Sequence, residues 1–278
     1  MRRSRLTVGI AALCVAVGIP APVRAAPAPA PLPTVNMEAT VLAAQIDPRR
    51  PDETLTPGAK ASVLAVEQAL QARHLLDARW VDGYFGTTTV TAYAAFQRSL
   101  GYTGLDANGL PGVSSLTKLG QGRFTVTHEI SAGAKVQRDG KTVDARTQAM
   151  LTEAERLLGS HLKLDQGSYN PGGDPTSAGT HDGGGVVDVN VTGMNATSRT
   201  DVARTLRQVG FAAWVRDPSQ GDWPWHIHAA AISDTDLSSQ AQHQTGDYYL
   251  GRNGLANSKP DDGPKVPIHT WEEYQRSH

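Results

Sequence analysis

The chain has 278 residues but only one cysteine, and aromatic residues make up 6% of it. The single cysteine, Cys14, lies in an N-terminal segment that we expect to be removed, so the mature protein would form no disulfide bonds. Any metal ion would then have to be held by histidine and carboxylate side chains. The formal net charge is −1, so the chain does not have the excess of basic residues that is typical of nucleic-acid-binding proteins. The His-Glu-x-x-His zinc motif is also absent.

Residues 1–25 are predicted to be a secretory signal peptide. Three arginines precede an apolar run from Leu6 to Ile19, and residues 23–25 have the pattern of a cleavage site. The run is shorter than the ~20 residues that a membrane-spanning helix needs. We therefore expect a protein that is secreted, extracellular or cell-wall associated, with no membrane attachment once the signal peptide is removed. We also expect it to be a monomer.

The next segment, residues 26–56, is rich in proline and alanine. It begins with alternating alanine and proline, and it contains two further prolines near its end, Pro48 and Pro51. Such a composition favours an extended polyproline II conformation and cannot build a core. The prediction is a linker.

Residues 57–120 are predicted to form a small all-α module of three helices. Thr56-Pro57 is a typical helix start, Thr88 begins a second segment with helical periodicity, and a shorter helix follows from about Ser114 to Leu119. The aromatic side chains of the module are expected in its core rather than against a ligand: Tyr84, Phe85, Tyr93 and Phe96.

Short motifs in this module carry a resemblance. Asp82-Gly83-Tyr84-Phe85-Gly86 is followed by Phe96-Gln97 and by a glycine, aspartate and leucine pattern from Gly101 to Leu119. This combination resembles the peptidoglycan-binding domain found on many wall hydrolases and covers residues 57–120. It implies that bacterial peptidoglycan is the partner. The family usually has Gly-Pro-x-Thr before its last helix, whereas here Ser114 can cap that helix instead.

Residues 121–250 alternate between strand-like and helix-like segments. This predicts an α+β domain with a small antiparallel sheet and packed helices. Asp139-Gly140 marks a hairpin turn, and Thr200 is a candidate helix cap. The main strands are expected over residues 124–130, 186–191 and 211–216 and after Trp225. The tail, residues 251–278, is expected to wrap this domain, because its aromatic side chains would be costly to expose.

Two short segments of this domain contain four side chains that can bind a metal ion. His181 and Asp188 flank the turn Gly183-Gly184-Gly185, and His226 and His228 share one face of a later strand. Imidazole and carboxylate groups are good zinc ligands. Each residue alone would more often be an ordinary hydrogen-bonded polar group, but the set predicts a metal site. No Gly-Lys-Ser/Thr follows the triple glycine, which argues against a phosphate-binding loop.

His-x6-Asp followed by His-x-His resembles the ligand signature of the LAS-type zinc peptidases, named for lysostaphin, D-Ala-D-Ala metallopeptidases and sonic hedgehog. The resemblance implies a Zn²⁺ ion held by His181, Asp188 and His228, with His226 as the catalytic histidine. It also implies zinc in a cleft on the open face of a small antiparallel sheet. With the signal peptide and the wall-binding-like module, it predicts a secreted zinc metallopeptidase that acts on peptidoglycan, as a D-alanyl-D-alanine carboxypeptidase or D,D-endopeptidase.

Arg216, expected on the same strand face as Trp214, is the candidate for binding a carboxylate or an oxyanion. The D-Ala-D-Ala members often have an arginine in the loop before the first ligand and a serine two residues before it. Here residues 166–170 contain no arginine, and Gly179 takes the place of the serine. A lysostaphin-like endopeptidase therefore remains an alternative, as does a non-catalytic wall-binding protein that keeps a metal for stability.

Overall fold

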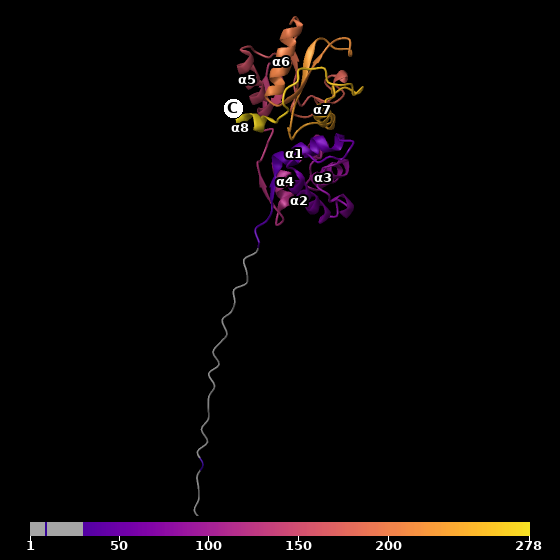
Figure 1. Cartoon of the computed structure of the whole chain (residues 1–278), viewed down its shortest axis with the longest axis vertical. Helices are drawn as coiled ribbons and strands as arrows, with labels where there is room; N and C mark the ends of the chain where they lie inside the picture. Colours follow the sequence, from indigo (N-terminus) through magenta and orange to yellow (C-terminus); the bar gives the residue numbers. More distant parts are fainter. Residues whose placement is uncertain (1–8, 10–29) are drawn as a thin grey trace, which may run out of the picture. The chain divides into compact units, whose positions relative to one another are not determined.

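The computed structural model describes residue 9 and residues 30–278, and residues 32–278 form one unit by their internal contacts. The predicted signal peptide and the first residues of the predicted linker lie outside the described residues, apart from residue 9. The described part has a mixed fold of α-helices and small β-sheets (Figure 1). None of its helices has the length and apolar character needed to cross a membrane.

The segment predicted as a linker contains a buried helix. Strand β1 (Thr34–Asn36) pairs in parallel with β2 (Thr125–Thr127), and helix α1 (Met37–Ile46) follows directly. Asn36 caps this helix by accepting a hydrogen bond from the backbone nitrogen of Ala39 at 3.1 Å. The prolines lie before and after α1, whereas the helix itself has none and is mostly apolar. This part of the chain is therefore packed into the core and is not an extended tether.

Residues 57–120 contain three α-helices. These are α2 (Lys60–Gln71), α3 (Thr87–Ser99) and α4 (Val113–Gly120), and short 3-10 helices precede or separate them: η1 (Asp47–Arg49), η2 (Ala78–Trp80) and η3 (Gly104–Ala107). Helix α2 begins three residues after Pro57, because Thr56 to Ala59 first form a turn closed by a 3.1 Å backbone hydrogen bond. Gly86 and Gly112, and not the expected Thr88 and Ser114, precede α3 and α4.

A buried carboxylate fixes the Asp-Gly turn before α3. Glu67 accepts hydrogen bonds from the backbone nitrogens of Asp82 at 3.0 Å and Gly83 at 2.8 Å, and from the Thr89 hydroxyl at 3.1 Å. Burial raises the pKa of Glu67 to about 7. Three of the four aromatic residues that we expected in the core are fully buried, while Tyr84 is half-buried: the buried ones are Phe85, Tyr93 and Phe96.

The central sheet has four strands, β5 (Leu164–Gln166), β6 (Val186–Asn190), β7 (Phe211–Arg216) and β8 (His226–Ala231). Their order is β5-β6-β8-β7 and every neighbouring pair is antiparallel, which confirms the predicted α+β class. A separate hairpin joins β3 (Lys135–Arg138) to β4 (Lys141–Asp144). Asp139 and Gly140 at its turn both have positive φ, as a tight hairpin turn requires. The strand expected over residues 124–130 is shorter, and it pairs with β1 outside the central sheet.

Alternation along these strands separates two faces of the sheet. One face carries apolar side chains such as Val187, Val189 and Ile227, which belong to a core shared with α5 (Ala145–Leu158) and α6 (Ala196–Gln208). Helix α6 is capped by Asn195, which accepts from Ser198 at 2.9 Å, so the expected cap Thr200 lies inside the helix. The opposite face carries the metal-competent side chains, and α7 (Ser239–Tyr249) contacts β7 and β8.

One hydrophobic core crosses the predicted boundary at residues 120 and 121. It joins the side chains of α1 to α4 with Val186, Ala230, Leu237 and Ala241. Figure 1 shows α1 next to α7, in agreement with the contacts between these helices. Gln45 at the end of α1 adds two hydrogen bonds to the turn after β8, at Ser233 N (2.9 Å) and Asp234 O (3.1 Å). Residues 32–120 are thus part of the same folded unit as the sheet.

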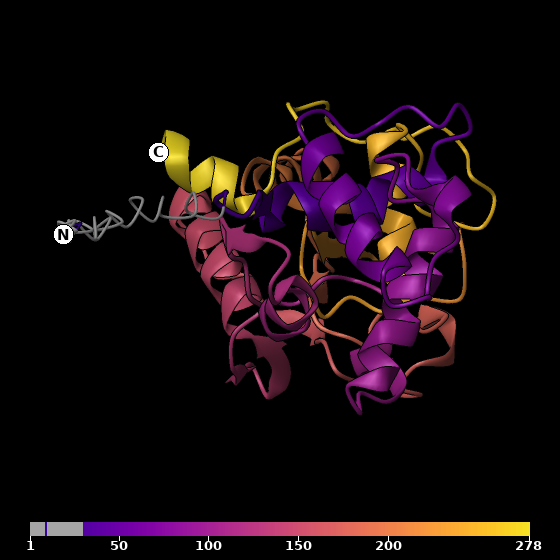
Figure 2. The same ribbon diagram turned by 90° about the horizontal axis from the view of Figure 1, so that it is seen from below.

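The tail is also tied to this unit. Helix α8 (Trp271–Ser277) lies beside α5, as Figure 2 shows, and Glu272 receives two hydrogen bonds of 2.8 Å from Arg146 of α5. Arg276 forms a two-pronged ion pair with Glu38 of α1. The tail thus packs along the domain, as expected from its aromatic content.

Candidate metal centre

The register of the sheet places the predicted site residues in two adjacent rows. Asp188 of β6 is paired with His228 of β8, which in turn is paired with Trp214 of β7. Two residues along, His226 is paired with Arg216. Because side chains two residues apart point to the same face, all five lie on the face opposite α5 and α6.

His181 reaches this face from the loop before β6, and the triple glycine explains the path of the loop. A Cβ on Gly184 would lie 2.6 Å from the Tyr169 hydroxyl and 2.7 Å from the Asp236 Cβ, so only glycine fits there. Gly185 has a φ of 74°, and its backbone nitrogen donates to Asp144 Oδ2 at 2.9 Å. The loop is therefore packed tightly between the end of the β3–β4 hairpin, at Asp144, and the turn after β8.

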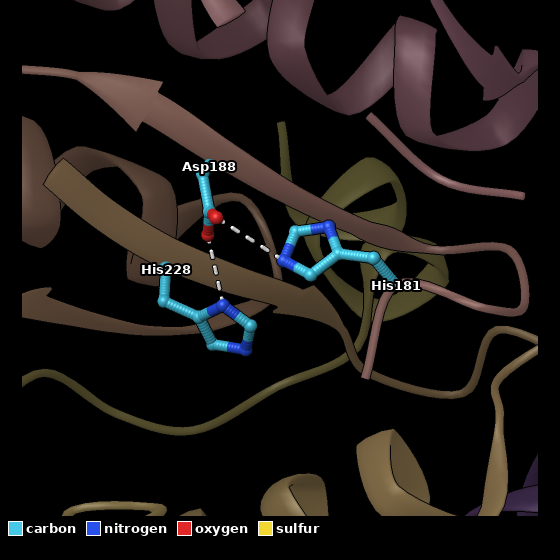
Figure 3. Close-up of side chains that lie close together, drawn as sticks. All are labelled: His181, Asp188 and His228. Carbon is cyan, nitrogen blue, oxygen red and sulfur yellow. Dashed lines mark hydrogen bonds and ion pairs between the residues drawn. The ribbon is translucent and has the colours of Figure 1, made fainter. Parts of the chain in front are cut away.

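The structure brings three of the predicted residues to one point (Figure 3). One potential ligand atom from each of His181, Asp188 and His228 lies within 4.8 Å of the others. His228 Nδ1 is 2.9 Å from Asp188 Oδ1, and His181 Nε2 is 3.3 Å from Asp188 Oδ2. The side chains of His181, Asp188 and His228 are 1%, 13% and 7% exposed, so the group is largely removed from water.

Hydrogen bonds behind the site decide which nitrogen of His228 is free. The Gln244 amide donates to Gly254 O at 3.1 Å, so it presents its oxygen to His228 Nε2 at 2.7 Å. Since that oxygen only accepts, His228 Nε2 carries the proton. Burial lowers the pKa of His228, which favours the neutral ring, and in this tautomer the Nδ1 lone pair is directed at Asp188. Two acceptors at 2.9 Å repel each other unless a cation lies between them.

His181 is oriented in the same way. Its Nδ1 donates to the backbone oxygen of Gly167 at 2.9 Å, which leaves Nε2 for the side of Asp188. Nε2 is buried and has no well-aligned hydrogen bond within the described part of the chain. A histidine held through one nitrogen by a backbone carbonyl, with the other nitrogen free, is the usual arrangement of a metal ligand.

The pKa shifts of Asp188 and His181 are consistent with a site that binds a cation. Burial alone would raise the pKa of Asp188, but the two imidazoles beside it hold that pKa far below the usual range. Burial also opposes charge on His181, yet the Asp188 carboxylate outweighs this and raises the pKa of His181. The carboxylate therefore favours positive charge beside it. A metal ion would supply such a charge, and its binding would compete with protons for the same ligand atoms.

His226 stands beside this group without belonging to it. Its Nδ1 donates to Pro224 O at 2.9 Å, and its Nε2 lies 3.8 Å from Asp188 Oδ1. The free nitrogen thus faces the site from a greater distance than those of His181 and His228. This placement suits an imidazole that exchanges protons next to a metal better than one that binds it.

A cavity of about 550 Å³ opens onto these residues. It is lined by the four metal-competent side chains and by Arg216, Tyr169 and Trp223, among others. Sequence patterns did not point to Gln244 or to the Gly167 carbonyl, although these groups orient His228 and His181. Neither lies in a motif, and only the folded chain brings them to the histidines.

Comparisons of the chain with known protein families, with curated proteins and with solved structures found no match. The geometry of the site and the residue patterns therefore carry the functional argument.

Proposed function

We propose that the chain is a secreted zinc-dependent peptidase that hydrolyses peptide bonds in bacterial peptidoglycan. The observation that carries this proposal is the arrangement of His181, Asp188 and His228. Two imidazole lone pairs converge on one carboxylate from fixed orientations, beside a cavity large enough for a peptide segment. Three protein ligands next to an open cavity are typical of catalytic zinc sites, whereas structural zinc sites are closed by four ligands.

The donor set fits zinc. It contains two neutral nitrogen donors and one carboxylate, with no sulfur, and zinc accepts this combination. A zinc ion bound there would act as a Lewis acid and supply a hydroxide nucleophile near neutral pH. His181 Nδ1–H and His228 Nε2–H are both anchored to protein oxygens, so the protein holds these ligands in place.

The remaining residues would handle the substrate. His226 Nε2 is free and faces the site, so it can take a proton and pass it to the leaving amino group. The cavity on the open face of the sheet would receive the peptide, because its lining offers hydroxyl, amide and aromatic groups. The proposal that the substrate is peptidoglycan rests on the resemblance of residues 57–120 to a wall-binding domain.

Purified bacterial sacculi test this proposal. We expect the zinc-loaded protein to release soluble peptide fragments, a chelator to abolish the release, and added zinc to restore it. The variant Arg204→Gln serves as a control, because Arg204 lies on the outer surface of α6 in an exposed ion pair. Sacculi that stay unchanged with every metal tested would contradict the peptidase and favour a wall-binding protein with a structural metal.

A further inference from the structure

The short segment after strand β5 runs beside the loop that carries His181 and holds it at three points. Gly167 O accepts a hydrogen bond from His181 Nδ1 at 2.9 Å, which fixes the ring. Asn170 N donates to His181 O at 2.9 Å, and Tyr169 N donates to Gly183 O at 2.7 Å, which fixes the backbone. The position of His181 therefore depends on where this segment lies.

Tyr169 has an unusual backbone conformation within this segment. Its φ is 55°, in the left-handed region that residues with a Cβ seldom adopt. Such a conformation persists only where the surrounding contacts impose it, and such residues cluster at functional sites. The contacts of the Tyr169 side chain supply this constraint.

The Tyr169 ring is held at its hydroxyl and on its face. The hydroxyl donates to Asp236 Oδ2 at 2.6 Å, a short hydrogen bond to a charged acceptor. Burial and the Asp236 carboxylate raise the pKa of Tyr169 well above its usual range, so the hydroxyl remains a donor. Lys135 Nζ lies 3.9 Å from the ring centroid, within the range of a cation–π interaction. The side chain thus has one fixed place at the edge of the metal cavity.

Asp236 holds the glycine loop as well as Tyr169. Its backbone oxygen accepts from Gly184 N at 2.8 Å, while its own backbone nitrogen donates to Asp234 Oδ1 at 2.9 Å. Gly184 lies against the phenol so closely that a Cβ there would be 2.6 Å from the hydroxyl oxygen and 2.7 Å from Asp236 Cβ. Tyr169 and Asp236 therefore grip Gly184 between them, and we call this pair the tyrosine clamp.

Of the three metal-competent residues that come together, His181 is the one that no strand holds. Asp188 and His228 are paired in register across β6 and β8, so the sheet fixes their positions. His181 comes from the loop, which continues through three glycines that have no side chains to hold it in place. In Figure 3, His181 approaches Asp188 from this loop. The contacts of the loop with its surroundings must therefore supply the order that strand pairing gives to the other two.

We propose that Tyr169 is a positioning residue for His181. Through the tyrosine clamp and its backbone hydrogen bond to Gly183, it fixes the loop so that His181 Nε2 stays directed at the Asp188 carboxylate. This inference rests on the metal centre of the proposed function. Tyr169 acts through His181, so loss of its hydroxyl should weaken metal binding without removing a ligand atom.

Zinc affinity tests this inference with two matched variants of the full-length chain. Tyr169→Phe keeps the ring but removes the hydroxyl of the clamp. Tyr274→Phe is the control, because the Tyr274 hydroxyl donates to Glu153 of α5 in a comparable tyrosine–carboxylate hydrogen bond away from the metal cavity. Competition with a chromogenic chelator should give about 10-fold weaker zinc binding for Tyr169→Phe, as loss of a group that orients a ligand does, and less than about twofold change for the control. Equal affinity in the wild type and Tyr169→Phe would overturn the positioning role, whether or not the chain hydrolyses peptides.

Exchange of the His181 Nδ1 proton with water gives a readout that a merely structural role would not move. In the metal-free chain, NMR of the imidazole N–H groups should show this exchange about 10-fold faster in Tyr169→Phe than in the wild type or in Tyr274→Phe, because local opening of the loop exposes the proton. Exchange that is unchanged, or that is equally faster in both variants, would refute the inference. A wild type that binds no zinc would contradict the metal centre, and the exchange rates would then still decide whether Tyr169 holds His181.

Discussion

Gln45 provides a direct test of whether the N-terminal helix is part of the folded unit. The side chain is 1% exposed and satisfies two buried backbone groups, Ser233 N at 2.9 Å and Asp234 O at 3.1 Å. Gln45→Ala leaves both groups without a partner. Each unsatisfied buried group costs about 1–3 kcal/mol, so we expect the free energy of unfolding to fall by about 2–6 kcal/mol for the two groups.

The control is Gln71→Ala at the end of α2, where the side chain is exposed. Alanine has a higher helix propensity than glutamine, and this stabilises both variants by a similar amount. The difference between the two unfolding free energies therefore reports the tertiary contacts of Gln45. Urea unfolding followed by tryptophan fluorescence and circular dichroism measures both free energies, and the two probes should give one coincident transition. A loss below about 0.5 kcal/mol for Gln45→Ala, equal to the control, would mean that α1 does not stabilise the sheet.

Further variants test the loop, the tail and the metal centre. Gly183→Ala places a Cβ against the backbone of the turn after β8 and should lower the free energy of unfolding by about 1–3 kcal/mol, measured by urea unfolding. Arg146→Met breaks its ion pairs with Glu272 and Asp234 and its hydrogen bond to Ile232 O, and it should cost about 2–4 kcal/mol in the same assay. An unchanged midpoint would show that these contacts do not stabilise the fold. Gln244→Ala removes the partner of His228 Nε2 and should weaken zinc binding about 10–100-fold by competition with a chromogenic chelator, whereas unchanged affinity would contradict the orienting role.

Local sequence patterns predicted the elements that form the face of the site. The alternation of valine with Asp188 and Asn190 indicated β6, and Asp139-Gly140 indicated the hairpin, because both depend on neighbouring residues. The spacing of His226 and His228 placed both on one strand face for the same reason. These features need no knowledge of distant contacts.

Features that depend on distant contacts could not be predicted in this way. Helix α1 lies between proline-containing segments and is stabilised by burial against α7, which no local pattern reveals. Asn195 and Thr200 are both good helix caps, and only the packed helix shows that Asn195 is used. The position of Arg216 on the sheet was predictable, but its contact with Asn253 and its lack of a carboxylate partner follow from the path of the tail.

We propose that His181, Asp188 and His228 hold one zinc ion and that His226 does not. Zinc content after dialysis, with calorimetric titration of the chelator-treated protein, measures this directly for the wild type and for the alanine variants of the four residues. We expect one zinc per chain in the wild type and in His226→Ala, and loss of zinc in the other three variants. A wild type that takes up no zinc, or a His226→Ala variant that loses it while His228→Ala retains it, would contradict this set of ligands.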